Sequence, residues 1–281
     1  MINKNNKDIV TIENITDLNL KETLNCGQCF RWEETADGEF KGVVKNKVVT
    51  ASMNGTTFIL KGATNNDLVT VWADYFDTSR NYKKIQELLG DVHPTLKKAI
   101  AYAPGIRILK QEPWEALCSF IISQNNNIPR IKGIIKSLCE LYGDKIDNEN
   151  YSFPTPFKLI RAREADLEPI KSGFRAKYIL DAVKKVGTGE VNFQQMKTMP
   201  LEEAREYLMQ INGVGPKVAD CVLLYGLQRL ECFPIDVWMK RAMKTLFPDV
   251  EDYTEFGKYA GVAQQYIFHY SRMHPELFDE E

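Results

Sequence analysis

The chain is poor in histidine, in long apolar runs and in net charge, and each scarcity excludes a class of protein. Three histidines occur among 281 residues, His93, His269 and His274. None has the spacing of a zinc site or a partner for a catalytic triad. No apolar stretch approaches the roughly eighteen residues of a membrane-spanning helix, and the N-terminus lacks the apolar segment of a secretion signal. The sequence predicts a cytoplasmic protein without membrane contact, and its compact length favours a prokaryotic one.

The charge is nearly balanced, with 36 Lys and Arg against 38 Asp and Glu and a formal net charge of −2. Such a balance argues against a protein that coats nucleic acid without specificity. It still permits a local basic face, because four basic residues fall near the motifs described below: Arg130, Arg175, Lys177 and Lys217.

Six cysteines are present: Cys26, Cys29, Cys118, Cys139, Cys221 and Cys232. Cys26-Gly-Gln-Cys29 has the spacing of a redox motif or half a zinc site, but no second pair matches it. We interpret these two as small apolar side chains on a strand. No four-cysteine cluster follows, which argues against an iron–sulfur centre. The sequence predicts reduced thiols in a cytoplasm.

The first sixty residues show the signals of antiparallel β-structure. Strand-like runs lie at 29–34, 40–44, 47–52 and 56–60. The dipeptides between them are Asp37-Gly38, Asn46-Lys47 and Asn54-Gly55. Asp-Gly and Asn-Gly are strong hairpin signals. The sequence therefore predicts a sheet of hairpins at the N-terminus.

Beyond Asn66 the apolar spacing becomes helical. Pro113 and Pro129 each begin a predicted helix, the first of which ends near Ser123. Further helices are predicted at 176–186, 201–210, 217–227, 237–245 and 254–271. The chain is thus expected to have an α+β fold, with an antiparallel β-rich domain over 1–95 and a helical body over 96–281.

Gly213-Val-Gly215 lies at the centre of a predicted helix–hairpin–helix over about 201–228. The positive φ of a tight turn is cheap only for glycine. Pro216 suits the first position of the second helix, because its missing N–H costs nothing there. The free N–H groups of Gly213, Gly215 and Val218 then point outward at a positive helix end, which is a binding site for phosphate.

Lys217 lies in the first turn of that second helix, where the macrodipole disfavours a positive charge and favours the neutral amine of a nucleophile. Asp236, in Pro234-Ile-Asp-Val, is predicted to cap the next helix, which keeps its carboxylate ionised. Taken singly, the two are most simply a surface lysine and an ordinary cap. Together with the hairpin they match the needs of base excision from DNA: an everted nucleotide, a nucleophile at C1′ and negative charge beside an oxocarbenium-like sugar.

Residues 208–241 resemble the helix–hairpin–helix Gly/Pro-Asp motif of base-excision DNA glycosylases. Similarity to the 8-oxoguanine (OGG) branch extends from about Leu24 to Arg272. The resemblance implies a TBP-like N-terminal β-domain followed by a two-part helical body. It implies a monomeric, cofactor-free glycosylase and AP lyase that excises 8-oxoguanine from duplex DNA, preferably opposite cytosine. Lys217 would form the Schiff base and Asp236 would stabilise the sugar cation.

The resemblance also assigns residues that enter the duplex. Ser123-Gln-Asn125-Asn-Asn-Ile-Pro-Arg130 matches the segment in which Asn125 fills the gap left by the flipped base and Arg130 contacts the orphaned cytosine. Arg175, in Gly-Phe174-Arg-Ala-Lys-Tyr, is its implied partner, because a guanidinium offers fixed donors for O2 and N3 of cytosine. Phe174 stands where relatives carry a Tyr wedge, and it keeps the stacking face without the hydroxyl. From the residues alone, the asparagines are equally an ordinary polar loop and Phe174 a core aromatic.

Four residues are assigned to a pocket for the damaged base. The carbonyl of Gly27, in Asn-Cys-Gly-Gln-Cys-Phe-Arg-Trp, would accept from the N7–H that 8-oxoguanine has and guanine lacks. The sequence cannot separate this role from that of a bulge glycine on a strand. Gln264 would bond the Watson–Crick edge, and Phe268, on the same helix face, would stack on the ring. Cys221 corresponds to the other side of that sandwich.

The hairpin carries two further implied features. Related proteins often hold a monovalent cation with hairpin carbonyls, here those of Met209, Ile211 and Val214, although no metal is required. Trp238 stands where relatives commonly have a phosphate-contacting histidine, and an indole N–H is also able to donate to phosphate. Gly213, Gly215, Val218 and Trp238 are thus the predicted phosphate contacts.

Three rival functions were weighed. A non-catalytic hairpin module needs neither Asp236 nor the pocket residues. An oxidised-pyrimidine glycosylase of the endonuclease III type is disfavoured by the missing cysteine cluster and the N-terminal β part. A monofunctional alkyl-base glycosylase does not need Lys217.

Overall fold

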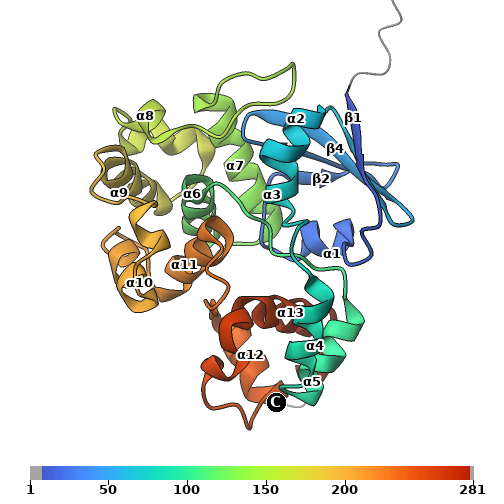
Figure 1. Cartoon of the computed structure of the whole chain (residues 1–281). Helices are drawn as coiled ribbons and strands as arrows, with labels where there is room; N and C mark the ends of the chain where they lie inside the picture. Colours follow the sequence, from blue (N-terminus) through green and yellow to red (C-terminus); the bar gives the residue numbers. More distant parts are fainter. Residues whose placement is uncertain (1–7, 279–281) are drawn as a thin grey trace, which may run out of the picture.

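The computed structural model describes residues 8–278 and confirms the α+β fold (Figure 1). Segment 1–7, part of the region predicted to lack a secretion signal, lies outside the described residues. The N-terminal part forms a five-stranded antiparallel sheet with strand order β1-β5-β4-β3-β2. Its strands are β1 (Ile9–Ile12), β2 (Trp32–Glu34), β3 (Phe40–Val44), β4 (Lys47–Asn54) and β5 (Thr57–Lys61).

The predicted hairpins form where the turn dipeptides lie. Lys45 and Asn46, with φ of 46° and 62°, connect β3 to β4, and Gly55, with φ of 60°, connects β4 to β5. Two positive φ values at a two-residue loop match the right-handed twist of the flanking strands. The sequence missed β1, which has four residues and alternates weakly, and only Val10 of it is buried.

The Cys26–Cys29 segment corrects the sequence interpretation, because it is not a strand. Helix α1 (Leu20–Asn25) precedes it, with the Asn19 side chain accepting from the N–H of Glu22. The chain then turns irregularly before β2, and both cysteines are buried, free thiols. The cap and the buried Leu20 and Leu24 favour the helix over the predicted strand.

The helices that follow the sheet form two groups (Figure 1). The elements up to the hairpin are α2 (Asn65–Asp67), η1 (Leu68–Trp72), α3 (Ala73–Tyr75), α4 (Tyr82–Gly90), α5 (Pro94–Tyr102), α6 (Pro113–Ser123), α7 (Ile128–Tyr142), α8 (Pro156–Leu159), η2 (Glu164–Ile170), α9 (Arg175–Gly187) and η3 (Gln195–Lys197). The remaining elements are α10 (Leu201–Met209), α11 (Pro216–Cys221), η4 (Val222–Gly226), α12 (Val237–Leu246), η5 (Tyr253–Tyr259), α13 (Ala260–Met273) and η6 (Pro275–Phe278).

Two predicted helices are interrupted. The helix expected over 254–271 divides into the 3₁₀ turn η5 and α13, because Gly257 adopts φ 60° and ψ −151°, a conformation open to glycine and foreign to a helix. The helix expected over 217–227 begins as α11 and widens into the π turn η4. π turns occur often at functional sites.

Two hydrophobic cores divide the molecule. The smaller lies between the sheet and η1–α3 and is rich in aromatic side chains such as Trp32, Phe58 and Trp72. The larger fills the helical body. Helix α4, which lies within the predicted 1–95 domain, contributes Tyr82, Ile85 and Leu89 to this larger core. In the part of the chain that the structure describes, no helix is long and apolar enough to cross a bilayer.

Gln28 joins the two parts although its side chain is fully buried. Its amide donates to the carbonyls of Thr23 (2.9 Å) and Arg107 (2.8 Å), and its oxygen accepts from the N–H of Leu109 (2.8 Å). The Gln111 side chain in turn donates to the backbone carbonyl of Gln28. The turn after α1 is therefore fixed to the segment that leads into the helical body.

Replacing Gln28 by Leu is expected to lower the free energy of unfolding by about 3 kcal/mol, because buried backbone groups lose their partners. Urea denaturation of the DNA-free protein measures this. Gln194→Leu, at an exposed position, is the matched control and should change stability by about 0.5 kcal/mol or less. Equal midpoints for the two variants would contradict the proposed role of Gln28.

Candidate active site

The hairpin between α10 and α11 has the predicted turn. Gly213 has φ of 78°, and a Cβ there would lie 2.3 Å from the ring of Tyr178, so only glycine fits. The N–H of Val214 donates to the carbonyl of Ile211 at 3.0 Å. Among residues 8–278, no acceptor pairs with the N–H groups of Gly213, Gly215 and Val218. The three predicted phosphate donors are thus unpaired, while the Val218 side chain is buried and anchors the turn.

Helix α9 holds this hairpin in place. Asp181 accepts from the N–H of Asn212 at 2.7 Å, and Lys185 donates to the carbonyl of Gln210. Asp181 and Lys185 also form an ion pair at 3.1 Å, one helical turn apart. With Tyr178 against Gly213, one face of α9 fixes the hairpin on both sides of its turn.

The hairpin carbonyls suit a hard monovalent cation only in part. The carbonyls of Met209 and Val214 accept no backbone bond from the described residues, whereas that of Ile211 accepts from Val214. Carbonyl oxygens are suitable ligands for such an ion, but the Lys185 ammonium already lies at the neighbouring carbonyl of Gln210. Within the described chain no cluster of His, Cys, Asp and Glu has the composition of a metal site.

Lys217 is half-buried in the first turn of α11. Its Nζ lies 3.4 Å from Ser123 Oγ and 5.1 Å from the ring centroid of Phe120, both on α6. Ser123 Oγ donates to the carbonyl of Phe120, so a lone pair faces the lysine. The amine is held by a neutral hydroxyl and an aromatic face, and no carboxylate lies within 4.0 Å of it in the described chain.

Asp236 caps α12 as predicted, because its Oδ1 accepts from the N–H of Met239 at 2.7 Å. Lys217 and Asp236 both act electrostatically on Cys221. Burial raises the pKa of the Cys221 thiol to about 12, while the Lys217 charge lowers it and the charge of Asp236 raises it. The predicted nucleophile and carboxylate therefore lie around one side chain, that of the predicted pocket cysteine.

Gly27 and Phe268 are brought together from opposite ends of the chain. Gly27 has φ of 87°, and a Cβ on it would lie 3.5 Å from Phe268 Cε1. Its two neighbours are fixed, since the carbonyl of Cys26 accepts from Gln265 at 3.1 Å and that of Gln28 accepts from Gln111. The carbonyl of Gly27 itself accepts no bond in the described structure. Gly27 is therefore an unpaired acceptor in a rigid turn, and not on the predicted strand.

Gln264 lies one turn before Phe268 on α13 and is 5% exposed. Its side-chain oxygen is buried without a hydrogen-bond partner. An unpaired buried amide oxygen costs about 1–3 kcal/mol, so the position is unfavourable unless a ligand supplies a donor. Gln265, the next residue, is fully satisfied by Tyr225 and Cys26.

The Asn125 loop is connected to the start of α9. Asn125 is exposed with φ of 47°, a conformation that asparagine tolerates better than most residues. Arg175 is buried, and its guanidinium donates to the carbonyls of Gln124, Asn125 (3.0 Å) and Ser172 (3.1 Å). In the DNA-free protein this predicted cytosine reader thus holds the loop that enters the duplex.

The other two residues predicted to contact the opposite strand are exposed beside it. Arg130 is exposed at the start of α7, and its charge, after burial, is the second cause that lowers the pKa of Arg175. Phe174 is 49% exposed, with the Arg175 guanidinium 4.4 Å from its ring centroid. The structure brings Asn125, Arg130, Phe174 and Arg175 onto one surface.

Trp238 differs from the expectation of a phosphate contact. Its indole N–H donates to Ser271 Oγ at 2.8 Å, and its ring packs on Phe278 at 5.2 Å. Indole has a single donor, so that donor is occupied within the protein.

Several residues of the site were not found from the sequence. Ser123 and Phe120 contact the lysine, Gln265 positions Gly27, and Ser271 accepts from Trp238. Ser123 directly precedes the asparagine segment, which is the one signal that marked it. The others look like ordinary helix positions because only the tertiary fold brings them to the site.

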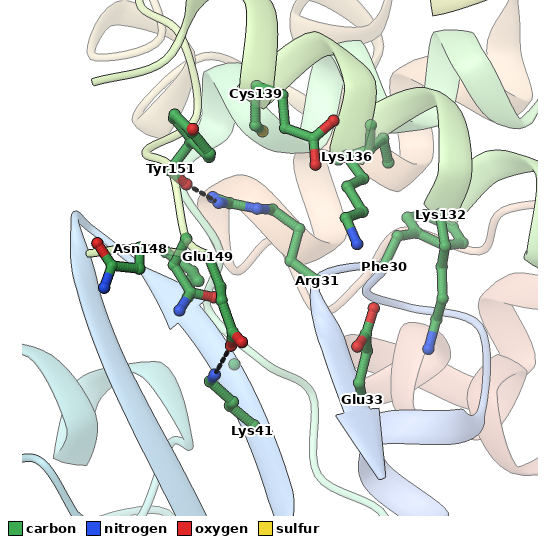
Figure 2. Close-up of a pocket in the computed structure, with 15 residues that line it drawn as sticks. Phe30, Arg31, Glu33, Lys41, Lys132, Lys136, Cys139, Asn148, Glu149 and Tyr151 are labelled. Carbon is green, nitrogen blue, oxygen red and sulfur yellow. Dashed lines mark hydrogen bonds and ion pairs between the residues drawn. The ribbon is translucent and has the colours of Figure 1, made fainter. Parts of the chain in front are cut away.

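A cavity of about 740 Å³ lies elsewhere, between the sheet, α7 and the loop after it. Figure 2 shows Arg31 bonded to Tyr151 and Lys41 paired with Glu149 at its wall. None of the predicted site residues lines it. A second cavity of about 480 Å³ is lined by Phe268 together with Asn25, Cys26, Ile128 and Arg272.

Comparisons with known proteins agree with this arrangement. Residues 10–117 match the family model described as 8-oxoguanine DNA glycosylase, N-terminal domain, and residues 118–256 match the HhH-GPD superfamily base excision DNA repair protein. An N-glycosylase/DNA lyase of Saccharomyces cerevisiae is 38% identical over 261 residues, which cover 82% of this chain and 69% of the yeast protein. The chain belongs to the OGG branch of the helix–hairpin–helix Gly/Pro-Asp DNA glycosylases.

Solved structures of this branch superpose over nearly the whole chain. The 8-oxoguanine glycosylase/lyase of Clostridium acetobutylicum, in complex with duplex DNA containing cytosine opposite 8-oxoG, is 39% identical with a TM-score of 0.90, covering 96% of this chain and 97% of that one. MBOgg1 with a low-affinity DNA ligand is 43% identical with a TM-score of 0.92, covering 97% and 98%.

Membership of the OGG branch makes the chain a base-excision repair enzyme, a DNA glycosylase with AP lyase activity. It excludes the non-catalytic hairpin module. The match of residues 10–117 to the OGG N-terminal domain also excludes an enzyme of the endonuclease III type.

Arg175→Met is expected to lower the free energy of unfolding of the DNA-free glycosylase by about 2 kcal/mol, because three carbonyls lose a charged donor. Arg130→Gln removes an exposed arginine from the same surface and should leave stability within about 0.5 kcal/mol. Urea denaturation compares the two variants. A stable Arg175→Met protein would show that Arg175 does not hold the Asn125 loop.

Proposed function

We propose that this glycosylase excises 8-oxoguanine from duplex DNA, preferably opposite cytosine, and then nicks the strand through a Schiff base on Lys217. The observation that carries the proposal is a pair of unpaired acceptors beside Phe268: the backbone carbonyl of Gly27 and the buried side-chain oxygen of Gln264. A base that pairs with both must offer hydrogen donors on two edges.

8-Oxoguanine has that pattern. Its N1–H and N2–H₂ groups offer donors to Gln264, and its N7–H offers one to Gly27. Guanine has a lone pair at N7, which would face the Gly27 carbonyl and repel it. A buried group left unpaired costs about 1–3 kcal/mol, and sites that bond a substrate hydrogen reject an analogue without it. Because its neighbours fix the turn, Gly27 cannot move away from guanine.

The reaction follows from the two charged residues near Cys221. The neutral amine of Lys217 attacks C1′ of the everted nucleotide, the C1′–N9 bond breaks, and the base leaves with the bonding pair and takes up a proton. Asp236, fixed as a helix cap, stabilises the oxocarbenium-like sugar. The aminal then opens to a Schiff base, loss of a proton from C2′ permits β-elimination, and the strand is cut 3′ to the lesion.

DNA is held without a basic coat. The unpaired N–H groups of Gly213, Gly215 and Val218 bind the backbone phosphate. Asn125 and Phe174 enter the stack, and Arg130 and Arg175 read the opposite base. The cytosine opposite 8-oxoG in the similar clostridial complex supports this pairing preference. The enzyme acts as a monomer.

Borohydride is expected to trap a covalent adduct between Lys217 and duplex DNA that contains 8-oxoguanine. Lys217→Gln should abolish trapping and nicking while DNA affinity stays within about threefold, because the hairpin N–H groups remain. Gel shift of the trapped species and a binding titration measure both effects. Lys240→Gln, an exposed lysine on α12, is the matched control and should trap normally.

Trapping that persists in Lys217→Gln would assign the nucleophile to another residue. Asp236→Asn separates the second role, because an amide oxygen still caps α12 but carries no charge. This variant should lower turnover with less effect on DNA affinity.

Gln264→Leu tests the base pocket. Single-turnover excision of 8-oxoguanine should fall roughly 5- to 150-fold, the equivalent of about 1–3 kcal/mol for one lost bond. The DNA-free protein should be at least as stable as the wild type, because an unpaired buried oxygen is removed. Trapping on an abasic duplex, which has no base to recognise, should be unchanged.

If Gln264→Leu excises 8-oxoguanine at the wild-type rate, the base edge is read elsewhere. Equal losses on lesion and abasic duplexes would show that the substitution disturbs the lysine and not the pocket.

A further inference from the structure

Arg272, the last residue but one of α13, lies between two aromatic rings at the edge of the site. Its guanidinium carbon is 5.8 Å from the ring centroid of Trp238 and 5.8 Å from that of Phe268. Both distances are within the range of a cation–π contact. One ring belongs to the first turn of α12, directly after the cap Asp236, and the other to the base pocket. The guanidinium therefore lies at the boundary between the proposed pocket and the end of α12.

This arginine has no anionic partner. Arg272 is exposed, and within residues 8–278 no carboxylate approaches it within 4.0 Å and no acceptor bonds to it. Glu22, the carboxylate that lines the same 480 Å³ cavity, is occupied by Asn19 and by the N–H of Gly105. A guanidinium stacked on rings keeps its N–H groups free at its edge, in the geometry that matches phosphate.

Trp238 does not provide this charge or donor. Its indole N–H is occupied by Ser271 Oγ, and Ser271 Oγ donates to the carbonyl of Phe268 at 3.0 Å. The bonds hold the two rings in a fixed relation on either side of Arg272. Val237, beside them, is 87% exposed, so no part of the described protein covers this face.

We propose that Arg272 binds a backbone phosphate of the DNA next to the everted nucleotide, with Trp238 and Phe268 acting as the platform that orients it. The inference rests on the proposed function, because it requires a duplex seated with its flipped nucleotide against Phe268. The aromatic platform reduces the side-chain freedom that a long arginine otherwise loses on binding. The contact adds affinity for any sequence and carries no base specificity.

The test is the salt dependence of binding to a duplex that contains a tetrahydrofuran abasic analogue, which the enzyme cannot cleave. One phosphate contact contributes about −0.9 to the slope of log K against log salt. Arg272→Gln should therefore reduce the magnitude of the slope by about 0.9 and weaken binding roughly eightfold at about 0.1 M salt. Arg272→Lys should restore the slope while recovering only part of the affinity, because it keeps the charge without the planar fork.

Arg161→Gln is the matched control. Arg161 is exposed and follows Ile160, which packs near Gly187 at the C-terminal end of α9, whereas Arg175 lies at the N-terminal end. The helix rise places those ends about 18 Å apart. This variant loses the same charge and should retain the wild-type slope.

A slope for Arg272→Gln no smaller in magnitude than that of Arg161→Gln overturns the inference. So does a slower excision of 8-oxoguanine with unchanged slope and affinity, since Arg272 would then act only by packing on Phe268. Both results presuppose a wild-type enzyme that binds and nicks the lesion duplex. A wild type that does neither refutes the proposed function instead.

Discussion

The contacts of one face of α9 are the constraint on which the site depends. Arg175 at its start fixes the carbonyls of the Asn125 loop. Further along, Tyr178 packs against Gly213, and Asp181 bonds the hairpin backbone. The loop proposed to enter the duplex and the hairpin proposed to bind its phosphate are therefore held by a single rigid helix. A helix transmits position over its length with little strain, so the spacing between these two elements is set before DNA arrives.

The acidic net charge of −2 becomes intelligible from the way this site offers positive potential. Backbone N–H groups at the hairpin and exposed arginines such as Arg130 and Arg272 supply it locally, and most other basic groups lie in ion pairs on the surface. Local donors orient a phosphate without attracting nucleic acid everywhere. The base pocket follows the same economy, with neutral acceptors in place of charges.

The sequence predicted the parts of the site that depend on local geometry. Gly213, Pro216 and Asp236 have roles that a turn or a helix end requires, and the structure places all three accordingly. It failed at Gly27, where a short helix capped by Asn19 precedes an irregular turn and no strand forms. Trp238 was predicted to face phosphate, but its N–H bonds Ser271. Such partners lie more than thirty residues apart, and no local pattern encodes them.

The six cysteines have a chemical consequence for an enzyme that meets oxidative damage. All are buried, and loss of hydration raises every one of their pKa values, to about 12 for Cys26, Cys139 and Cys221. Peroxides react with the thiolate and scarcely with the thiol. At neutral pH almost no thiolate exists in the folded chain, even at the position beside Lys217. The protein is thus built to resist the oxidants that generate 8-oxoguanine.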